Sequence, residues 1–128
     1  MIDFKNAKYF KLRRAQKSEF LDKISSFLME DENIIETYKT IRDGIVFTDK
    51  RIIIINIQGI TGKKKSFTSI SYSKIQVFSV ETAGVFDLES ELYIWISPAG
   101  EMKFEFLTSG DILTVCKCIS KYSSWDRT

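Results

Sequence analysis

Residues 42–55 read Arg42-Asp43-Gly44-Ile45-Val46-Phe47-Thr48-Asp49-Lys50-Arg51-Ile52-Ile53-Ile54-Ile55 and are the most informative part of the chain. Two β-prone runs flank Asp49-Lys50, which is the spacing of a β-hairpin closed by a tight turn. The second run is apolar at every position from Ile52 to Ile55, so both faces of that strand require cover. The stretch therefore predicts a β-rich scaffold with packing on both sides of its sheet.

Length and composition indicate one globular domain. A chain of 128 residues with 44% hydrophobic and 28% charged residues is ordinary for such a domain. The net charge of +2 is too small to predict nucleic-acid binding. We expect a cytoplasmic protein, because the N-terminus lacks the apolar segment of a signal peptide. Cys116 and Cys118 would point to opposite sides of a helix and do not suggest a disulfide.

Short alternating patterns predict seven strands between two helices. The strand patterns cover residues 34–40, 45–48, 51–57, 66–72, 75–81, 92–96 and 102–106. Apolar residues at three- and four-residue spacing predict an amphipathic helix from Ser18, its expected N-cap, to Leu28, and another over residues 112–122. Short strands at this spacing indicate a sandwich or a partly open barrel, and the C-terminal helix would close one open end.

The N-terminal part of the chain differs from the rest in composition. Residues 1–17 hold six basic side chains against one acid, Asp3. We expect residues 1–32 to form a basic, helical arm and residues 33–128 to form the β domain, the two making one globular unit. Such an arm could lie on an anionic membrane or contact a nucleic acid, but six charges are not specific, and a solvated or subunit-wrapping segment is the more common interpretation.

Several segments, taken in order, resemble the bacterial pleckstrin-homology (PH) family. They are Ile41-Arg42-Asp43, Val46-Phe47-Thr48-Asp49-Lys50-Arg51, Gln58-Gly59-Ile60-Thr61-Gly62-Lys63-Lys64, Phe78-Ser79-Val80-Glu81-Thr82-Ala83-Gly84, and Glu91-Leu92 with Ile94-Trp95-Ile96-Ser97. The resemblance implies a mainly β (α+β) fold, in which a seven-stranded bent sheet pair is capped by a C-terminal helix. It also implies assembly into cyclic homo-oligomers, pentamers in small members, a role in protein–protein interaction, and no enzymatic activity.

The strand that follows the tight turn carries more apolar surface than one barrel interior accommodates. Ile52 and Ile54 point to one face, and Ile53, Ile55 and Ile57 point to the other. Leaving the second set in water would forgo roughly 1.5–3 kcal/mol for each isoleucine. Either the helix expected at residues 18–28 covers this set within one chain, or another subunit does, or the two share it.

Catalytic chemistry is poorly supported by the sequence. The chain has no histidine, which removes the usual base near neutral pH and the commonest transition-metal ligand. It has no glycine motif for phosphate binding or for a nucleophile elbow, and two cysteines alone do not form a tetrahedral zinc site. Asp87, Glu89 and Glu91 alternate and could hold a divalent ion, but a solvated acidic loop is the favoured interpretation. We expect no enzymatic activity, no cofactor and no metal.

The main functional hypothesis is therefore a non-enzymatic, ring-forming module that contacts an unidentified protein. The residues expected at the oligomer interface are Ile53, Ile55, Tyr93 and Trp95, because Tyr and Trp are favoured in interfaces. Burial of the aromatic pair beneath the N-terminal helix is the alternative. The polar surface expected to meet the partner consists of Arg42, Asp49, Lys50, Glu81 and Thr82.

A second hypothesis is a peripheral binder of anionic lipid or of another polyanion. Its candidate anion-binding residues are Lys63, Lys64, Lys65, Arg13 and Arg14. A solvated lysine turn is the favoured interpretation of residues 63–65. On the sequence alone, we expect neither a membrane nor a nucleic acid to be the main partner.

Overall fold

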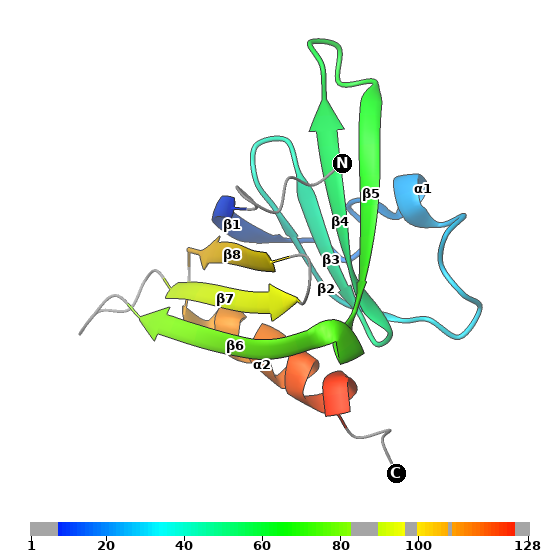
Figure 1. The fold of residues 1–128 in the computed structure, drawn as a ribbon. Helices are drawn as coiled ribbons and strands as arrows, with labels where there is room; N and C mark the ends of the chain where they lie inside the picture. Colours follow the sequence, from blue (N-terminus) through cyan, green and yellow to red (C-terminus); the bar gives the residue numbers. More distant parts are fainter. Residues whose placement is uncertain (1–7, 83–89, 97–99, 108, 125–128) are drawn as a thin grey trace.

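The computed structural model describes residues 8–82, 90–96, 100–107 and 109–124 (Figure 1). Within these ranges, eight strands form one sheet in the order β5-β4-β3-β2-β1-β8-β7-β6. The strands are β1 (Lys8–Ala15), β2 (Ile34–Lys39), β3 (Gly44–Thr48), β4 (Arg51–Gln58), β5 (Lys64–Ser71), β6 (Ile75–Thr82), β7 (Ser90–Ile96) and β8 (Gly100–Phe106). The helices are α1 (Leu21–Ile24), the 3-10 turn η1 (Tyr72–Lys74) and α2 (Ser109–Ser124).

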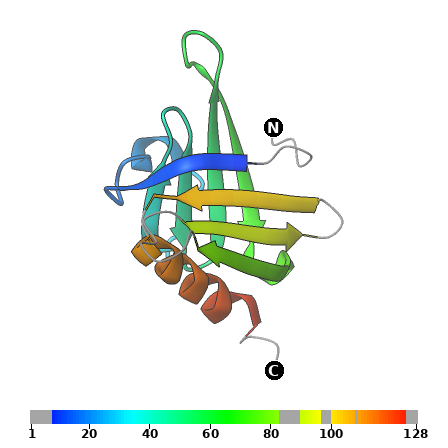
Figure 2. The same cartoon turned by 90° about the vertical axis from the view of Figure 1, so that its left-hand side faces the viewer.

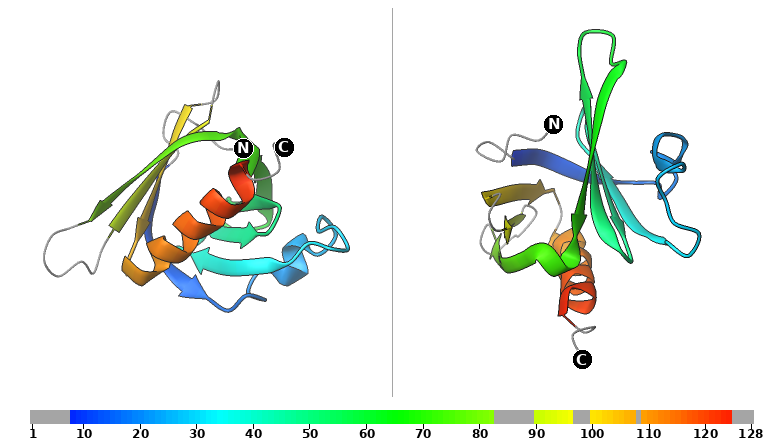
Figure 3. Two further views of the ribbon diagram at one scale, coloured as in Figure 1. Left: turned by 90° about the horizontal axis from the view of Figure 1, so that it is seen from below. Right: turned by 45° about the vertical axis from the view of Figure 1, so that its right-hand side comes forward.

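The sheet is strongly bent, and its two halves enclose an apolar interior. Strands β2 to β5 run across the direction of β6 to β8 in Figure 1. Helix α2 packs against η1, β6, β7 and β8 and covers the side that the bent sheet leaves open (Figure 3). The seven predicted strands correspond to β2 to β8. The structure therefore confirms the expected PH-like, partly open barrel with a C-terminal capping helix.

The expected basic arm is instead a strand in the middle of the sheet. β1 runs antiparallel to β2 and parallel to β8, and Tyr9 lies opposite Phe104. Tyr9 and Leu12 are both buried although strict alternation would place them on opposite faces. A β-bulge between them resolves this conflict, and Lys11 adopts a left-handed φ of 54° there. β1 thus joins the two halves of the sheet.

The expected N-terminal helix is only one turn long. α1 spans four residues, and Phe20 precedes it without a side-chain cap, so Ser18 is not its N-cap. Ser25 and Ser26 follow, and serine side chains compete with helical hydrogen bonds. A single turn is unstable alone, so its position depends on packing by Phe20 and Ile24, which are both buried.

The two faces of β4 belong to two separate apolar clusters. Ile52 and Ile54 lie in the barrel interior, together with Ile45, Phe47 and residues of β7, β8 and α2. The second cluster lies outside the sheet and consists of Phe20, Ile24, Val46, Ile53 and Ile55, flanked by Leu28, Ile34 and Ile57. We call this second set the outer cluster. Its cover is the segment at residues 20–28 of the same chain.

The burial of Ile53 and Ile55 beneath this segment contradicts their predicted place at an oligomer interface. Ile53 is 2% exposed and Ile55 is fully buried, so neither offers apolar surface to another subunit. The alternative in which the N-terminal segment covers these isoleucines within one chain is the correct one. Gly44 permits the close approach, since a Cβ there would lie 2.8 Å from Phe20 Cδ2 and closer still to two other ring carbons.

A buried ion pair fixes the far end of the covering segment. The Glu32 carboxylate has no exposed side-chain surface and accepts hydrogen bonds from Arg51 Nε and Nη2, each at 2.9 Å. It also accepts from Thr48 Oγ1 at 2.6 Å and from the Met29 backbone at 3.1 Å. Arg51 Nη2 in turn donates to the Phe27 carbonyl at 2.8 Å. Burial alone would raise the pKa of Glu32, but these hydrogen bonds outweigh it and lower that pKa.

Candidate interaction surfaces

The residues proposed for a polar partner surface do not lie together. Arg42 is in the β2–β3 turn, whereas Asp49 and Lys50 are in the β3–β4 turn at the opposite end of β3. Asp49 accepts hydrogen bonds from the backbone and the side chain of Asn33, and Lys50 pairs with Asp31 at 3.3 Å. Glu81 is exposed near the end of β6.

The fifth proposed residue, Thr82, ends β6, and its side chain lies outside the described part of the structure. The same is true of Asp87 and Glu89, which lie outside the described residues altogether. Asp49 and Lys50 therefore act within the β3–β4 turn, and Arg42 and Glu81 belong to separate surfaces.

The proposed anion-binding residues also separate into groups. Arg14 is committed to an ion pair, with its Nε 3.1 Å from Glu36 Oε2. Arg13, one residue earlier, is exposed and lines two surface hollows. Three exposed lysines lie at the start of β5 and just before it, namely Lys63, Lys64 and Lys65. Arg13 and the three lysines remain available to a ligand.

Tyr93 and Trp95 form an aromatic pair on the outer face of β7. Their rings stack with centroids 6.2 Å apart, and both are half-buried because the alternating residues of β7 fill the interior. Tyr93 Oη donates to Glu91 Oε2 at 2.6 Å, and Lys103 Nζ lies 3.2 Å from the same carboxylate. The hydrogen bond from Tyr93 is the largest influence that lowers the pKa of Glu91. The outer cluster lies on the other half of the sheet, so the N-terminal segment does not bury this pair.

Strand β6 adds an apolar edge next to the aromatic pair. Val77 is 53% exposed and lies opposite Trp95, and Ser79 lies opposite Tyr93. Phe78 and Val80 are 36% and 41% exposed. In the described part of the chain, β6 pairs with β7 alone. Its other edge therefore carries backbone donors and acceptors without a partner strand.

A third surface lies at the end of the molecule opposite α2. The β2–β3 turn and the longer β4–β5 hairpin both project from this end, as Figures 1 and 2 show. Ile41 in the turn is 98% exposed, and Ile60 at the hairpin tip is fully exposed. Arg42 Nη2 donates to the Gly59 carbonyl at 2.6 Å and ties the two projections together. No local pattern in the sequence indicates the exposure of either isoleucine.

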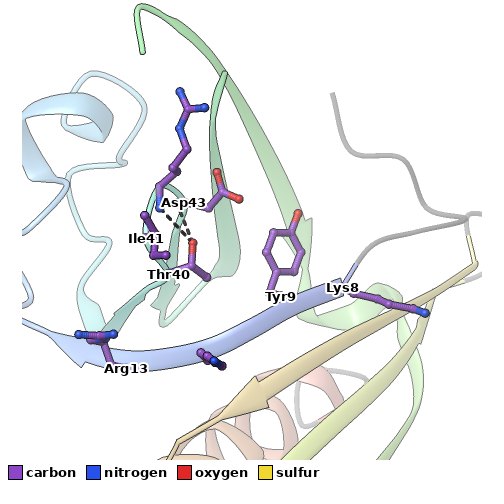
Figure 4. Close-up of a pocket in the computed structure, with 8 residues that line it drawn as sticks. Lys8, Tyr9, Arg13, Thr40, Ile41 and Asp43 are labelled. Atoms are coloured by element: carbon purple, nitrogen blue, oxygen red, sulfur yellow. Dashed lines mark hydrogen bonds between the residues drawn. The ribbon is translucent and has the colours of Figure 1, made fainter. Parts of the chain in front are cut away.

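A hollow of about 560 Å³ lies between β1 and the β2–β3 turn (Figure 4). Four of its lining side chains are basic, and the complete lining is Lys8, Tyr9, Lys11, Arg13, Thr40, Ile41, Arg42 and Asp43. In Figure 4, Tyr9 points from β1 toward the turn, whereas Lys8 extends away along the strand. The cations thus surround an open hollow and do not converge on one point. A smaller hollow of about 390 Å³ lies on the Phe20 side of Ile41.

The described side chains offer little catalytic chemistry. No three of their carboxylates and thiols converge as metal ligands would. Burial raises the pKa of the Cys116 thiol to about 11 and also raises that of Cys118, which keeps both thiols protonated near neutral pH. Within the described ranges, no helix has the length and apolar character needed to cross a bilayer.

A strongly bent sheet whose open side is closed by a C-terminal helix defines a PH-type domain. The chain belongs to the bacterial PH domain family, because the family described as Bacterial PH domain matches residues 3–123. This match confirms the resemblance found in the sequence.

Similar proteins occur in Bacillus subtilis (strain 168). Uncharacterized protein YjqA is 56% identical over 78 residues, which are 61% of this chain and 62% of YjqA. The match thus spans less than two thirds of that relative. Uncharacterized protein YozO is 31% identical over 100 residues, which are 78% of this chain and 86% of YozO.

Two solved structures share the fold at substantial sequence identity. One is a DUF1696 family protein with a pleckstrin-homology domain from Shewanella loihica PV-4. It is 37% identical in sequence, the TM-score is 0.76, and the match covers 89% of this chain and 98% of that one. The other is a pleckstrin homology domain from Shewanella amazonensis SB2B, 40% identical with a TM-score of 0.62 and coverage of 85% and 89%. These relatives indicate no enzyme family.

Proposed function

We propose that this chain is a non-catalytic interaction module whose copies assemble through their sheet edges into a closed ring that binds a protein partner. The observation that carries the proposal is the bare edge of β6. Natural sheets protect exposed edges with charges, proline or bulges. β6 has a register shift between Ile75 and Val77, but over residues 75–81 it has one charged residue, Glu81, and it exposes Val77, Phe78 and Val80.

The second end strand supplies a different edge. β5 ends the sheet on its other side and carries Lys64 and Lys65, whereas β6 carries Glu81. Contact between two unlike edges is heterologous, and repeating it generates a ring when the rotation closes. Opposite charges on the two edges favour this pairing over the pairing of like edges. The family resemblance suggests five subunits.

The aromatic pair extends the proposed interface beyond the strand edge. Val77 and Trp95 lie opposite each other on β6 and β7, so a neighbour that reaches β6 also reaches Trp95 and Tyr93. Half-exposed Tyr and Trp are the residue types that dominate binding energy at interfaces. A ring would repeat the remaining polar surface, and such repetition strengthens weak binding to a partner.

The test is the mass of the protein in solution by light scattering over a range of concentrations. We expect the unaltered chain to form one closed oligomer and Val77→Lys to shift it toward the monomer, because an exposed lysine opposes edge pairing. The matched control is Ile41→Lys, which places the same charge on the fully exposed turn and should leave the mass unchanged. A monomer at all concentrations would overturn the proposal, and so would equal effects of the two variants.

A further inference from the structure

We propose that the side of α2 that faces β2 binds an acidic segment of a partner protein, with an apolar side chain of that segment inserted between the helix and the strand. We call this surface the α2 hollow. Its lining residues are Ile35, Thr114, Lys117, Cys118, Lys121 and Tyr122. The inference goes beyond the proposed assembly, because none of these residues lies on the edge strands β5 and β6 and one copy of the chain carries the whole site.

The α2 hollow exists because the helix packs closely against only part of the bent sheet. α2 covers the open side of the sheet (Figure 3), and its main packing partners are η1, β6, β7 and β8. β2 is not among them. A space of about 310 Å³ therefore stays open between α2 and the start of β2. This volume lies near the lower limit for ligand pockets and suits a single large side chain.

The floor of the α2 hollow is apolar and held in place. Ile35 and Tyr122 are partly buried against the barrel interior, and the ring of Tyr122 stacks on that of Tyr72 with centroids 5.7 Å apart. Cys118 is 5% exposed, and its Sγ lies 3.1 Å from the Tyr72 hydroxyl oxygen. Burial raises the pKa of Cys118, so the thiol is neutral and behaves as a small apolar group. The floor therefore suits an aliphatic or aromatic side chain.

The rim of the α2 hollow is cationic. Lys117 and Lys121 are exposed and lie one helical turn apart, so both ammonium groups border the same opening. Lys121 Nζ lies 5.3 Å from the centroid of the Tyr122 ring, which keeps this cation beside the floor. Within the described chain, neither lysine forms an ion pair with an acid. Two positive charges around an apolar floor match a ligand that carries acids beside an apolar side chain.

The acidic residues on the neighbouring elements are held by other partners. Glu36 follows Ile35 on β2 and pairs with Arg14 at 3.1 Å. Asp49 in the β3–β4 turn accepts hydrogen bonds from the backbone and the side chain of Asn33. Neither carboxylate therefore serves as the partner of the two lysines. An acidic ligand would supply that partner, whereas a basic ligand would be repelled.

Leu113 extends the surface along the helix. It precedes Lys117 by four residues, so the two side chains lie in one line on α2. At 63% exposure, it is the most exposed large hydrophobic residue of the described chain apart from Ile41 and Ile60 in the two turns. A segment that lies along α2 thus meets an apolar side chain, two cations and the hollow. The matching partner carries apolar side chains interspersed with acids.

This combination favours a protein segment over a small anion or a nucleic acid. A small anion uses the lysines but gains nothing from the apolar floor. Nucleic acids are bound through many phosphate contacts and through stacking on exposed rings. The α2 hollow offers two cations, and its one ring, Tyr122, already stacks on Tyr72. An acidic segment with an apolar side chain uses the rim and the floor together.

The experiment measures the binding of short fluorescent peptides to the full chain by anisotropy. One peptide alternates glutamate with leucine, a second has serine in place of leucine, and a third has lysine in place of glutamate. We expect only the first to bind. The double variant Lys117→Glu, Lys121→Glu should weaken its binding at least about tenfold. The matched control Lys17→Glu, Lys63→Glu makes the same change of charge at exposed lysines of other elements and should bind normally.

A second pair of variants tests insertion into the α2 hollow. Thr114→Phe fills the hollow with a ring of the chain itself and should abolish binding of the first peptide while leaving both lysines in place. Ser120→Phe is the matched control, because Ser120 is exposed on a different side of α2. Circular dichroism should be unchanged in every variant. Amide chemical shifts in the unaltered chain should change most at Ile35 and at residues 114–122.

Several outcomes would overturn the proposal. They are no binding of the first peptide at about 1 mM, equal binding of either other peptide, equal losses in the two double variants, and binding that Thr114→Phe leaves intact. Light scattering on the same samples keeps this result distinct from assembly, since none of the variants lies in β5 or β6. A monomer that binds the peptide contradicts the ring alone, and a ring that does not bind it contradicts the α2 hollow alone.

Discussion

The outer face of β4 and the edge strand β6 are both apolar, yet the chain covers only one of them. Ile53 and Ile55 on β4 lie beneath Phe20 and Ile24, whereas Val77 on β6 is more than half exposed. The more hydrophobic of the two strands, β4, is thus the one whose outer face needs no partner subunit. The less conspicuous strand is left bare, so an interface is better sought at β6 than at the run of isoleucines.

The difference arises because a segment that covers an apolar face must itself be held in place by specific contacts. A segment with one helical turn has little stability of its own. The Glu32–Arg51 ion pair attaches the end of this segment to the β3–β4 hairpin, and burial of Phe20 and Ile24 holds its start. If this account is correct, substitutions in the cover should destabilise the chain strongly, and matched substitutions at exposed sites should not.

The largest effect is expected from Arg51→Met. It leaves the Glu32 carboxylate buried without its cation, which typically destabilises by about 3–5 kcal/mol. Lys50→Met is the control, because its ion pair with Asp31 is exposed and should contribute less than about 1 kcal/mol. Urea unfolding at neutral pH measures both. Equal midpoints for the two variants would show that the buried pair does not anchor the cover.

Ile55→Ala should follow, with a loss of about 2–5 kcal/mol, because it removes a fully buried side chain and leaves a cavity in the outer cluster. Val77→Ala is the matched change on β6 and should alter the unfolding free energy by less than about 0.5 kcal/mol per monomer. The pair separates stability from assembly. A large loss from Val77→Ala at a concentration where the chain is monomeric would contradict the contrast between the two surfaces.

Much of this architecture could be predicted from the sequence, because alternation is a local signal. The β3–β4 hairpin follows from two β-prone runs that flank a tight turn, and the strands β7 and β8 follow from period-two patterns. β1 was missed for a physical reason. Tyr9 and Leu12 are three residues apart, and only a bulge with Lys11 in a left-handed conformation places both inside. The intervening basic residues also resemble a solvated arm.

The sites were predicted less well than the fold, because they depend on contacts between distant residues. Glu32 meets Thr48 and Arg51 across sequence separations of 16 and 19 residues, and no local pattern announces such a pair. The expected outward position of Tyr93 and Trp95 follows from alternation and agrees with the structure. The exposure of Ile41 and Ile60 appears only when both turns are seen to project into solvent.

A smaller loss, about 1–3 kcal/mol, is expected from Gly44→Ala. The added Cβ would overlap the buried ring of Phe20, so the ring or the covering segment must shift. The double variant Gly44→Ala, Phe20→Leu tests this cause, because the smaller side chain removes the overlap. Its unfolding free energy should match that of Phe20→Leu alone. If Gly44→Ala is equally harmful in both backgrounds, the clash is not with Phe20.

The smallest effect concerns acid pH. The folded-state pKa of Glu32 is lowered, so the stabilisation from its ion pair is complete above the unfolded carboxyl range and is lost as pH falls through the folded value. The unfolding free energy should therefore decrease from about pH 5 downward. Glu32→Gln should flatten this decrease, and Glu91→Gln should flatten it less, because the pKa of Glu91 is lowered mainly by the hydrogen bond from Tyr93 and both groups lie on the outer face of the sheet. Urea titrations at several pH values measure the slope. A profile unaltered by Glu32→Gln would mean that other carboxylates govern acid unfolding and that the cover is not held by charge.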